Sequence, residues 1–152
     1  MSFDVLQDKI KVKKNPTVAG LDARVEYVPP LILKKYTDQQ GETLEAAASA
    51  VLEFDKGLID ALADVVPAVK PQSAYFEMLG WRGMKALEEV ITYAKEKGLF
   101  VIADVKRGDI GTTAAAYSEA WLGSTQVGGT PCPVFDADCV TLNGYMGSDA
   151  IK

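Results

Sequence analysis

The chain has 152 residues, of which 48% are hydrophobic and 24% charged, as in a globular domain with a real core. Its net charge of -5 argues against nucleic acid or an anionic membrane as a partner. It has no histidine and only two cysteines, Cys132 and Cys139, which excludes Ser-His-Asp and Cys-His catalysis and His-ligated metals within these residues. Its start does not resemble a signal peptide and no apolar run reaches membrane length, so we expect a cytoplasmic location.

Hydrophobic patterning predicts short strands that alternate with helices. The expected strands are residues 17–21, 65–69, the apolar run 99–103 with its polar continuation, and 139–142. The expected helices are residues 2–10, 31–36, 43–64, 81–97 and 112–122, and a further helix begins at 148–150. Residues 38–41 and 123–138 lack a clear period and are predicted to be a turn and an irregular connection.

Some residues are predicted to set the ends of these elements. Thr43 is expected to cap the longest helix, and Gly98 to end the helix after it in a left-handed conformation. Either Asp109 or Thr112 is the expected cap of the helix 112–122. Pro67 lacks an N–H group and is therefore expected at the start of its strand.

Charged residues stand where three of the predicted strands end. Asp22 follows the first strand, Lys70 the second, and Asp104 and Lys106 the third. A spacing of two puts Asp104 and Lys106 on the same face of their strand. Charges beside a core cost free energy unless they are paired, so function is the favoured reason for this arrangement. A turn or helix-cap role for Asp22 stays open at this point.

The β-α order predicts an α/β fold with a parallel sheet and right-handed crossovers. A doubly wound sheet and a (β/α)8 barrel both satisfy this order, and in both the functional side chains gather at the carboxyl ends of the strands. No Gly-x-Gly-x-x-Gly motif or phosphate-binding loop follows a predicted strand, which disfavours a doubly wound nucleotide-binding domain.

Three motifs resemble those of the orotidine 5'-phosphate decarboxylase family. The run Asp104-Val105-Lys106-Arg107-Gly108-Asp109-Ile110 resembles the family's Asp-x-Lys-x-x-Asp-Ile signature. The segment Gly20-Leu21-Asp22 and Lys70 are similar to its two other anchors. Residues 70–77, KPQSAYFE, are similar to the longer, bacterial branch of the family. The resemblance extends over almost the whole chain.

The resemblance implies a homodimeric (β/α)8 barrel of the TIM-barrel type that converts orotidine 5'-phosphate to UMP in pyrimidine biosynthesis, without a metal or organic cofactor. By position, Lys106 would stabilise the carbanion and protonate C6, and Asp104 would lie beside the substrate carboxylate. Lys70 and Asp109 would complete an alternating Lys-Asp-Lys-Asp array. Asp22 and Lys70 would contact the ribose hydroxyls.

The resemblance also implies a site that is shared between two subunits. Asp109, Ile110 and Thr113 would reach into the neighbouring subunit's site, which makes dimerisation part of the mechanism. A (β/α)8 barrel takes about 250 residues. We therefore expect residues 1–152 to form a single domain that supplies the first four β/α units, the N-terminal half of the barrel. The other half would carry the groups that grip the phosphate and the pyrimidine.

Two alternatives stay open. Sugar-phosphate decarboxylases and aldolases of the same superfamily share the Asp-x-Lys-x-x-Asp motif but use Mg²⁺ to stabilise an enediolate. Their second strand is similar, with a metal-binding glutamate where Lys70 stands, and a lysine there would repel the metal. The second alternative is that this half-barrel is a folding or assembly module without activity of its own.

Overall fold

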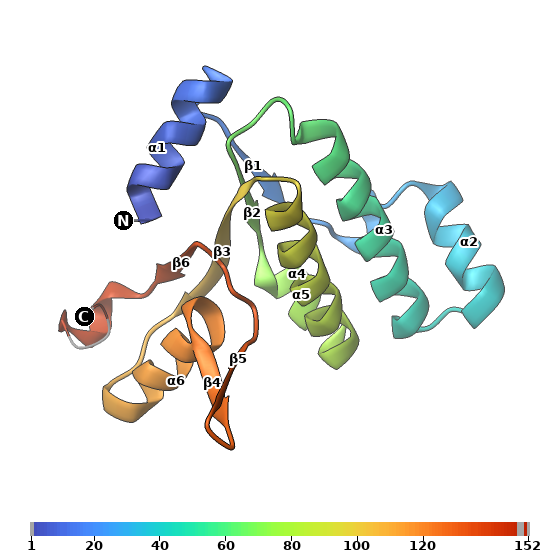
Figure 1. The fold of residues 1–152 in the computed structure, drawn as a ribbon. Helices are drawn as coiled ribbons and strands as arrows, with labels where there is room; N and C mark the ends of the chain where they lie inside the picture. The colour runs from blue at the N-terminus through green and yellow to red at the C-terminus, as the bar shows by residue number, and fades with distance from the viewer. Residues whose placement is uncertain (1, 149–150, 152) are drawn as a thin grey trace.

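A parallel four-stranded sheet forms the centre of the computed structural model, which describes residues 2–148 and 151 (Figure 1). The strand order is β1-β2-β3-β6, and every neighbouring pair is parallel. The strands are β1 (Val18–Leu21), β2 (Ala68–Pro71), β3 (Phe100–Arg107) and β6 (Cys139–Leu142). This order confirms the predicted α/β class, since each strand is joined to its neighbour by a helical crossover.

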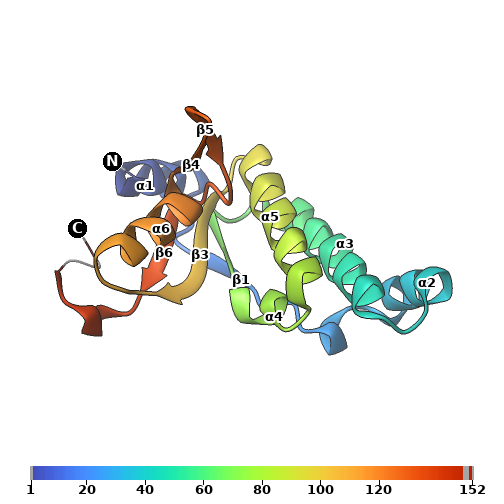
Figure 2. The same cartoon turned by 90° about the horizontal axis from the view of Figure 1, so that it is seen from below.

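Six α-helices and two 3-10 turns surround this sheet in the described part of the chain. The helices are α1 (Ser2–Lys13), α2 (Pro30–Gln40), α3 (Leu44–Leu62), α4 (Ser73–Glu77), α5 (Gly80–Glu96) and α6 (Gly111–Leu122). The turns are η1 (Val25–Tyr27) and η2 (Gly144–Met146). Figure 2 shows α3 and α5 side by side along the sheet, with α2 outside α3. The sheet and these helices enclose one hydrophobic core.

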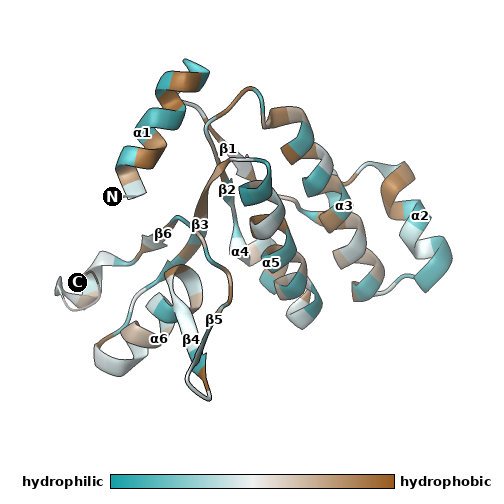
Figure 3. Ribbon diagram, in the orientation of Figure 1, coloured by the Kyte–Doolittle hydropathy of each residue, from teal (hydrophilic) through white to brown (hydrophobic). Residues whose placement is uncertain are grey.

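The core explains why the long helices form where they do. The apolar stripe of α3 buries Val51 and Ile59, and the Thr43 hydroxyl accepts the N–H of Ala46 at 3.2 Å, so its predicted capping role is confirmed. Strand β3 is apolar along most of its length (Figure 3), and Phe100 and Val101 are fully buried. Gly98 precedes β3 with a φ of +78°, the left-handed conformation that was predicted to end α5.

Several predicted boundaries were wrong. Residues 38–41 were expected to be a turn, but α2 continues to Gln40 and ends at Gly41, whose φ is +73°. The second strand is shifted toward its carboxyl end, to Ala68–Pro71, and Pro67 directly precedes it. Because Pro67 lacks an N–H group, it takes part through its carbonyl, which accepts the N–H of Phe100 at 3.0 Å.

The segment 123–138, expected to be irregular, contains an antiparallel hairpin. Strands β4 (Ser124–Val127) and β5 (Thr130–Pro133) are joined by Gly128 and Gly129, which both have positive φ. Two such glycines suit a two-residue hairpin turn, and this was the overlooked signal. The hairpin extends away from the parallel sheet (Figure 1).

The start of α6 also differs from expectation. Its N-cap is Ile110, without a side-chain capping bond, so neither Asp109 nor Thr112 caps it. The Asp109 carboxylate instead accepts the N–H of Ile110 at 2.8 Å, and Gly111, the first residue of the helix, has a φ of +53°. The helix start predicted at 148–150 falls partly outside the described residues. Over residues 2–148 and 151, no helix has the length and apolarity needed to cross a membrane.

Candidate active site

The carboxyl ends of β2 and β3 bring together three charged side chains, Lys70, Asp104 and Lys106, which we call the charge array. Lys70 Nζ lies 2.5 Å from Asp104 Oδ2, and Lys106 Nζ lies 2.6 Å from Asp104 Oδ1. The two ammonium groups therefore bind opposite oxygens of one carboxylate. Asp104 and Lys106 share a face of β3, as their spacing predicts.

Asp104 is the centre of this array and is 6% exposed. Two further groups donate to it: Gln72 Nε2 to Oδ2 at 2.9 Å, and the Thr141 hydroxyl to Oδ1 at 2.8 Å. Burial acts to raise the pKa of Asp104. The hydrogen bonds from Lys106, Lys70 and Thr141 together outweigh burial and lower the pKa to about 2. Asp104 is consequently a carboxylate at neutral pH, fixed by four donors.

Lys106 is the most accessible member of the charge array. Its side chain is 65% exposed, against 32% for Lys70 and 8% for Asp104. The centre of the array is thus buried, while the Lys106 side chain is largely exposed. Such an ammonium can interact with a bound anion and can supply a proton to it.

Asp22 lies at the same edge of the sheet, one residue beyond β1. Leu21, the last residue of β1, accepts the N–H of Gln72 at 3.2 Å, so the end of β1 adjoins the chain that follows Lys70. Asp22 itself is exposed. Asp22, Lys70, Asp104 and Lys106 thus all stand at the carboxyl edge of the sheet, where parallel α/β folds place their functional groups.

A second carboxylate, Asp55 on α3, is buried within electrostatic reach of Asp22. It is fully buried, and within the described residues neither of its oxygens has a hydrogen-bond partner. Burial and, to a lesser extent, the Asp22 carboxylate raise the pKa of Asp55 to about 7. Asp55 was not expected as a site residue from the sequence, because it occupies one position in a helix whose apolar pattern is otherwise regular.

Asp109, Ile110 and Thr113 lie apart from the charge array, around the start of α6. Ile110 is 59% exposed and Thr113 is also exposed, while the Asp109 carboxylate is turned toward the N–H of Ile110. In the described part of the chain, Asp109 makes no ion pair with Lys70 or Lys106. The four-membered array expected from the sequence is therefore a three-membered one within a single chain.

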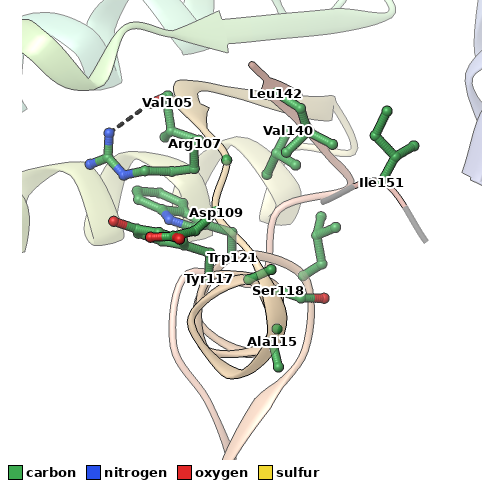
Figure 4. Close-up of a pocket in the computed structure, with 14 residues that line it drawn as sticks. Val105, Arg107, Asp109, Ala115, Tyr117, Ser118, Trp121, Val140, Leu142 and Ile151 are labelled. Carbon is green, nitrogen blue, oxygen red and sulfur yellow. Dashed lines mark hydrogen bonds between the residues drawn. The ribbon is translucent and has the colours of Figure 1, made fainter. Parts of the chain in front are cut away.

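Asp109 lines a cavity of about 380 Å³ between α6 and the ends of β3 and β6 (Figure 4). One wall is Arg107, whose guanidinium donates to the Val105 carbonyl at 2.6 Å and pairs with Glu77 at 2.7 Å. The same guanidinium lies 6.0 Å from the ring centroid of Trp121. None of the three residues of the charge array lines this cavity. The cavity is thus separate from the charge array.

Two residues of the site were not assigned a role from the sequence. Gln72 lies two positions after Lys70, a spacing that could have indicated the same face of an extended chain. Thr141 is the one hydroxyl in the predicted strand 139–142, and a polar residue there was the available signal. Within residues 2–148 and 151, no three His, Cys, Asp or Glu side chains are grouped so as to hold a metal ion.

Comparison with known proteins places this site in a family. The orotidine 5'-phosphate decarboxylase / HUMPS family matches residues 51–152, which include the charge array and Thr141. The chain belongs to this family. It is 38% identical over 149 residues to the orotidine 5'-phosphate decarboxylase of Caldicellulosiruptor saccharolyticus, and 41% identical over 136 residues to that of Rhodopirellula baltica.

Solved structures of the family share the fold. The structure of Leishmania donovani OMP decarboxylase matches with a TM-score of 0.71 and 30% identity, over 99% of this chain and 47% of that one. The Caldicellulosiruptor relative is matched over 98% of this chain and 49% of its own length, and the Rhodopirellula relative over 90% and 43%. The chain spans about half the length of the curated relatives it matches. Its parallel sheet corresponds to part of the TIM barrel of the family's solved structures.

Proposed function

We propose that the protein carrying this chain decarboxylates orotidine 5'-phosphate to UMP, without a metal, as a step of pyrimidine biosynthesis. The observation that carries the proposal is the Asp104 carboxylate held between the ammonium groups of Lys70 and Lys106 at the carboxyl edge of the sheet. Membership of the decarboxylase family supports the same reaction class. The cytoplasmic location expected from the sequence stays a prediction.

Lys106 is assigned the central role. When the bond between C6 and the carboxylate carbon breaks, CO₂ leaves and the electron pair stays on C6, which has no adjacent carbonyl to delocalise it. A fixed ammonium stabilises this pair as it develops, by about 4 kcal/mol at about 4 Å and an effective dielectric constant of 20. The Lys106 proton then passes to C6 and gives UMP. The exposed, charge-paired Lys106 ammonium is suited to both tasks.

Asp104 holds the Lys106 ammonium in place through their ion pair. Its low pKa means that it stays ionised over the whole physiological range. A carboxylate beside the substrate's own carboxylate also disfavours the bound ground state relative to the transition state. Lys70 balances the charge and, with Asp22, is proposed to contact the ribose hydroxyls.

The remaining substrate contacts are proposed to come from outside this part of the molecule. Asp109, Ile110 and Thr113 are assigned to the active site of a second subunit, because within one chain the Asp109 carboxylate bonds the N–H of Ile110 and lines the cavity beside α6, which the charge array does not line. The second half of the barrel is assigned the phosphate and pyrimidine contacts. The activity is thus proposed for a homodimer of complete barrels.

The Mg²⁺-dependent sugar-phosphate reaction is the less favoured alternative. Four donors surround Asp104, two of them cationic, so a divalent ion that bound this carboxylate would displace one or more of these donors and lie beside an ammonium group. The test is an assay of the purified protein with orotidine 5'-phosphate, with and without EDTA. We expect turnover that EDTA leaves unchanged. Turnover abolished by EDTA and restored by Mg²⁺, or no turnover of this substrate, would contradict the proposal.

The non-catalytic alternative concerns residues 1–152 alone. It is tested by assaying this 16.3 kDa segment by itself with orotidine 5'-phosphate. We expect no turnover, because the segment lacks the proposed phosphate and pyrimidine contacts. Activity of the isolated segment would show that the substrate needs nothing outside these residues.

A further inference from the structure

Strand β3 contains an irregularity at the charge array. Its register with β6 pairs Ala103 with Val140 and Arg107 with Leu142. Three residues of β3, namely 104–106, therefore lie opposite the single residue Thr141. In such a bulge the extra residues cannot all be bonded by the partner strand's backbone, and their N–H groups need another acceptor.

The Thr141 side chain supplies that acceptor. Its hydroxyl oxygen accepts the N–H of Val105 at 3.1 Å and the N–H of Lys106 at 3.0 Å. The same hydroxyl donates its proton to Asp104 Oδ1 at 2.8 Å. The hydroxyl thus accepts two hydrogen bonds and donates one, which is its full hydrogen-bonding capacity, so its orientation is fixed.

The bulge sets the backbone of Lys106 in a rare conformation. Its φ is +49°, in the left-handed region that residues with a side chain seldom adopt. Such a conformation persists only where surrounding contacts hold it, and it is typical of functional sites. The hydrogen bond from the Lys106 N–H to Thr141 is a contact of this kind, because it fixes the peptide group at the strained residue itself.

We propose that Thr141 is a positioning residue that orients the Lys106 ammonium. Its hydroxyl holds the β3 bulge through hydrogen bonds from two backbone amides and holds the Asp104 carboxylate through a third hydrogen bond. As a contribution to catalysis, this inference rests on the proposed decarboxylase function. Thr141 does not touch the reacting atoms. It acts on Lys106 indirectly, through the backbone N–H groups of Val105 and Lys106 and through the Asp104 carboxylate.

The experiment compares Thr141→Val, which keeps the shape and removes the hydroxyl, with Thr141→Ser, which keeps the hydroxyl. Thr125→Val, on the exposed strand β4, is the matched control. In the whole protein we expect Thr141→Val to lower kcat for orotidine 5'-phosphate roughly 10- to 100-fold with little change in KM, since misplacement of a reacting group has effects of this size. Thr141→Ser should recover most of the loss, and Thr125→Val should behave as wild type.

Amide hydrogen exchange provides a readout that does not depend on activity. The Lys106 amide should be protected in the wild type and in Thr141→Ser, and should exchange at least about tenfold faster in Thr141→Val. A Lys106 amide that exchanges in the wild type as fast as an unbonded surface amide would overturn the proposal, even if Thr141→Val does not fold. Wild-type kcat in Thr141→Val, or a lowered kcat with unchanged exchange, would also overturn it.

The two proposals fail in different ways. If the wild type does not decarboxylate orotidine 5'-phosphate, the proposed function is wrong, while the exchange comparison still decides whether Thr141 holds the bulge. If the wild type is active and the exchange of Lys106 does not respond to Thr141, only the role of Thr141 is wrong.

Discussion

Two buried aspartates of this chain ionise in very different pH ranges because their surroundings differ. Asp104 receives four hydrogen bonds, two of them from ammonium groups, and its pKa falls to about 2. Asp55 has no hydrogen-bond partner among the described residues, and burial raises its pKa to about 7. Asp104 is therefore a carboxylate at neutral pH, whereas Asp55 is mainly the neutral acid only below about pH 7.

The state of Asp55 predicts how stability changes with pH. Its pKa rises from 3.8 in the unfolded chain to about 7 in the folded one, so the folded state resists its ionisation. The stability linked to this group is complete below about pH 4, is lost as the pH rises toward 7, and the loss is at most about 4 kcal/mol. Asp55→Asn should remove this dependence and unfold at higher urea concentration than wild type at pH 8.

The comparison at pH 5 supplies the internal reference for this prediction. There Asp55 is largely protonated, so the variant should gain less or even lose stability, because a buried amide brings its own unpaired groups. Asp64→Asn, on a fully exposed carboxylate, is the control and should change little at either pH. An equal effect of Asp55→Asn at pH 5 and pH 8 would show that Asp55 does not titrate in this range.

At the scale of elements, the site depends on close packing between α4 and α5, which follow β2. A Cβ atom on Gly83 of α5 would lie 1.9 Å from the backbone carbonyl oxygen of Phe76 in α4. Neither atom can move without shifting a helix. Only glycine therefore allows α4, which begins three residues after Lys70, to pack against α5 in this way.

This contact predicts opposite effects for two substitutions of the same kind. Gly83→Ala should lower the free energy of unfolding by about 2–3 kcal/mol through overpacking. Gly57→Ala in α3, where the new methyl group meets nothing within 4 Å, should raise it by roughly 0.5–1 kcal/mol through helix propensity. Urea unfolding of the two variants checks the pair. A stable Gly83→Ala protein would mean that α4 and α5 are not so closely packed.

Features that depend on the local sequence pattern, such as the position of a strand and the face on which its side chains lie, could be predicted from the sequence. The apolar run before Asp104 identified β3, and the spacing of Asp104 and Lys106 placed both on one face. The bulge could not be predicted, because it depends on the register between β3 and β6, strands separated by more than thirty residues. The role of Thr141 follows from that register, so it was missed for the same reason.

At the scale of the whole molecule, the four parallel strands form an open sheet in which β1 and β6 each have one neighbour. Curated relatives are about twice as long as this chain. The chain can therefore supply the charge array. The phosphate contacts are proposed to come from the second half of the barrel, and further contacts from the partner subunit. The separation of Asp109 from the charge array within one chain is what a site shared between subunits would require.

Sharing between subunits predicts complementation in mixed dimers. Lys106→Ala and Asp109→Ala should each be inactive, but a dimer with one subunit of each kind contains one site in which both residues are intact. In a random mixture half of the dimers are mixed, so about a quarter of the wild-type activity should return. Activity no higher than that of the two inactive parents would show that Asp109 serves its own chain's site or none.

The most direct test of the central claim is the turnover of orotidine 5'-phosphate by the Lys106→Ala protein. Loss of the ammonium removes about 4 kcal/mol of carbanion stabilisation and the proton donor, so we predict a fall in kcat of at least roughly a thousandfold. The thermal unfolding midpoint should stay close to that of the wild type. Lys97→Ala, which removes an exposed ammonium paired with Asp60, should retain full turnover. Near-normal turnover by Lys106→Ala would contradict the account.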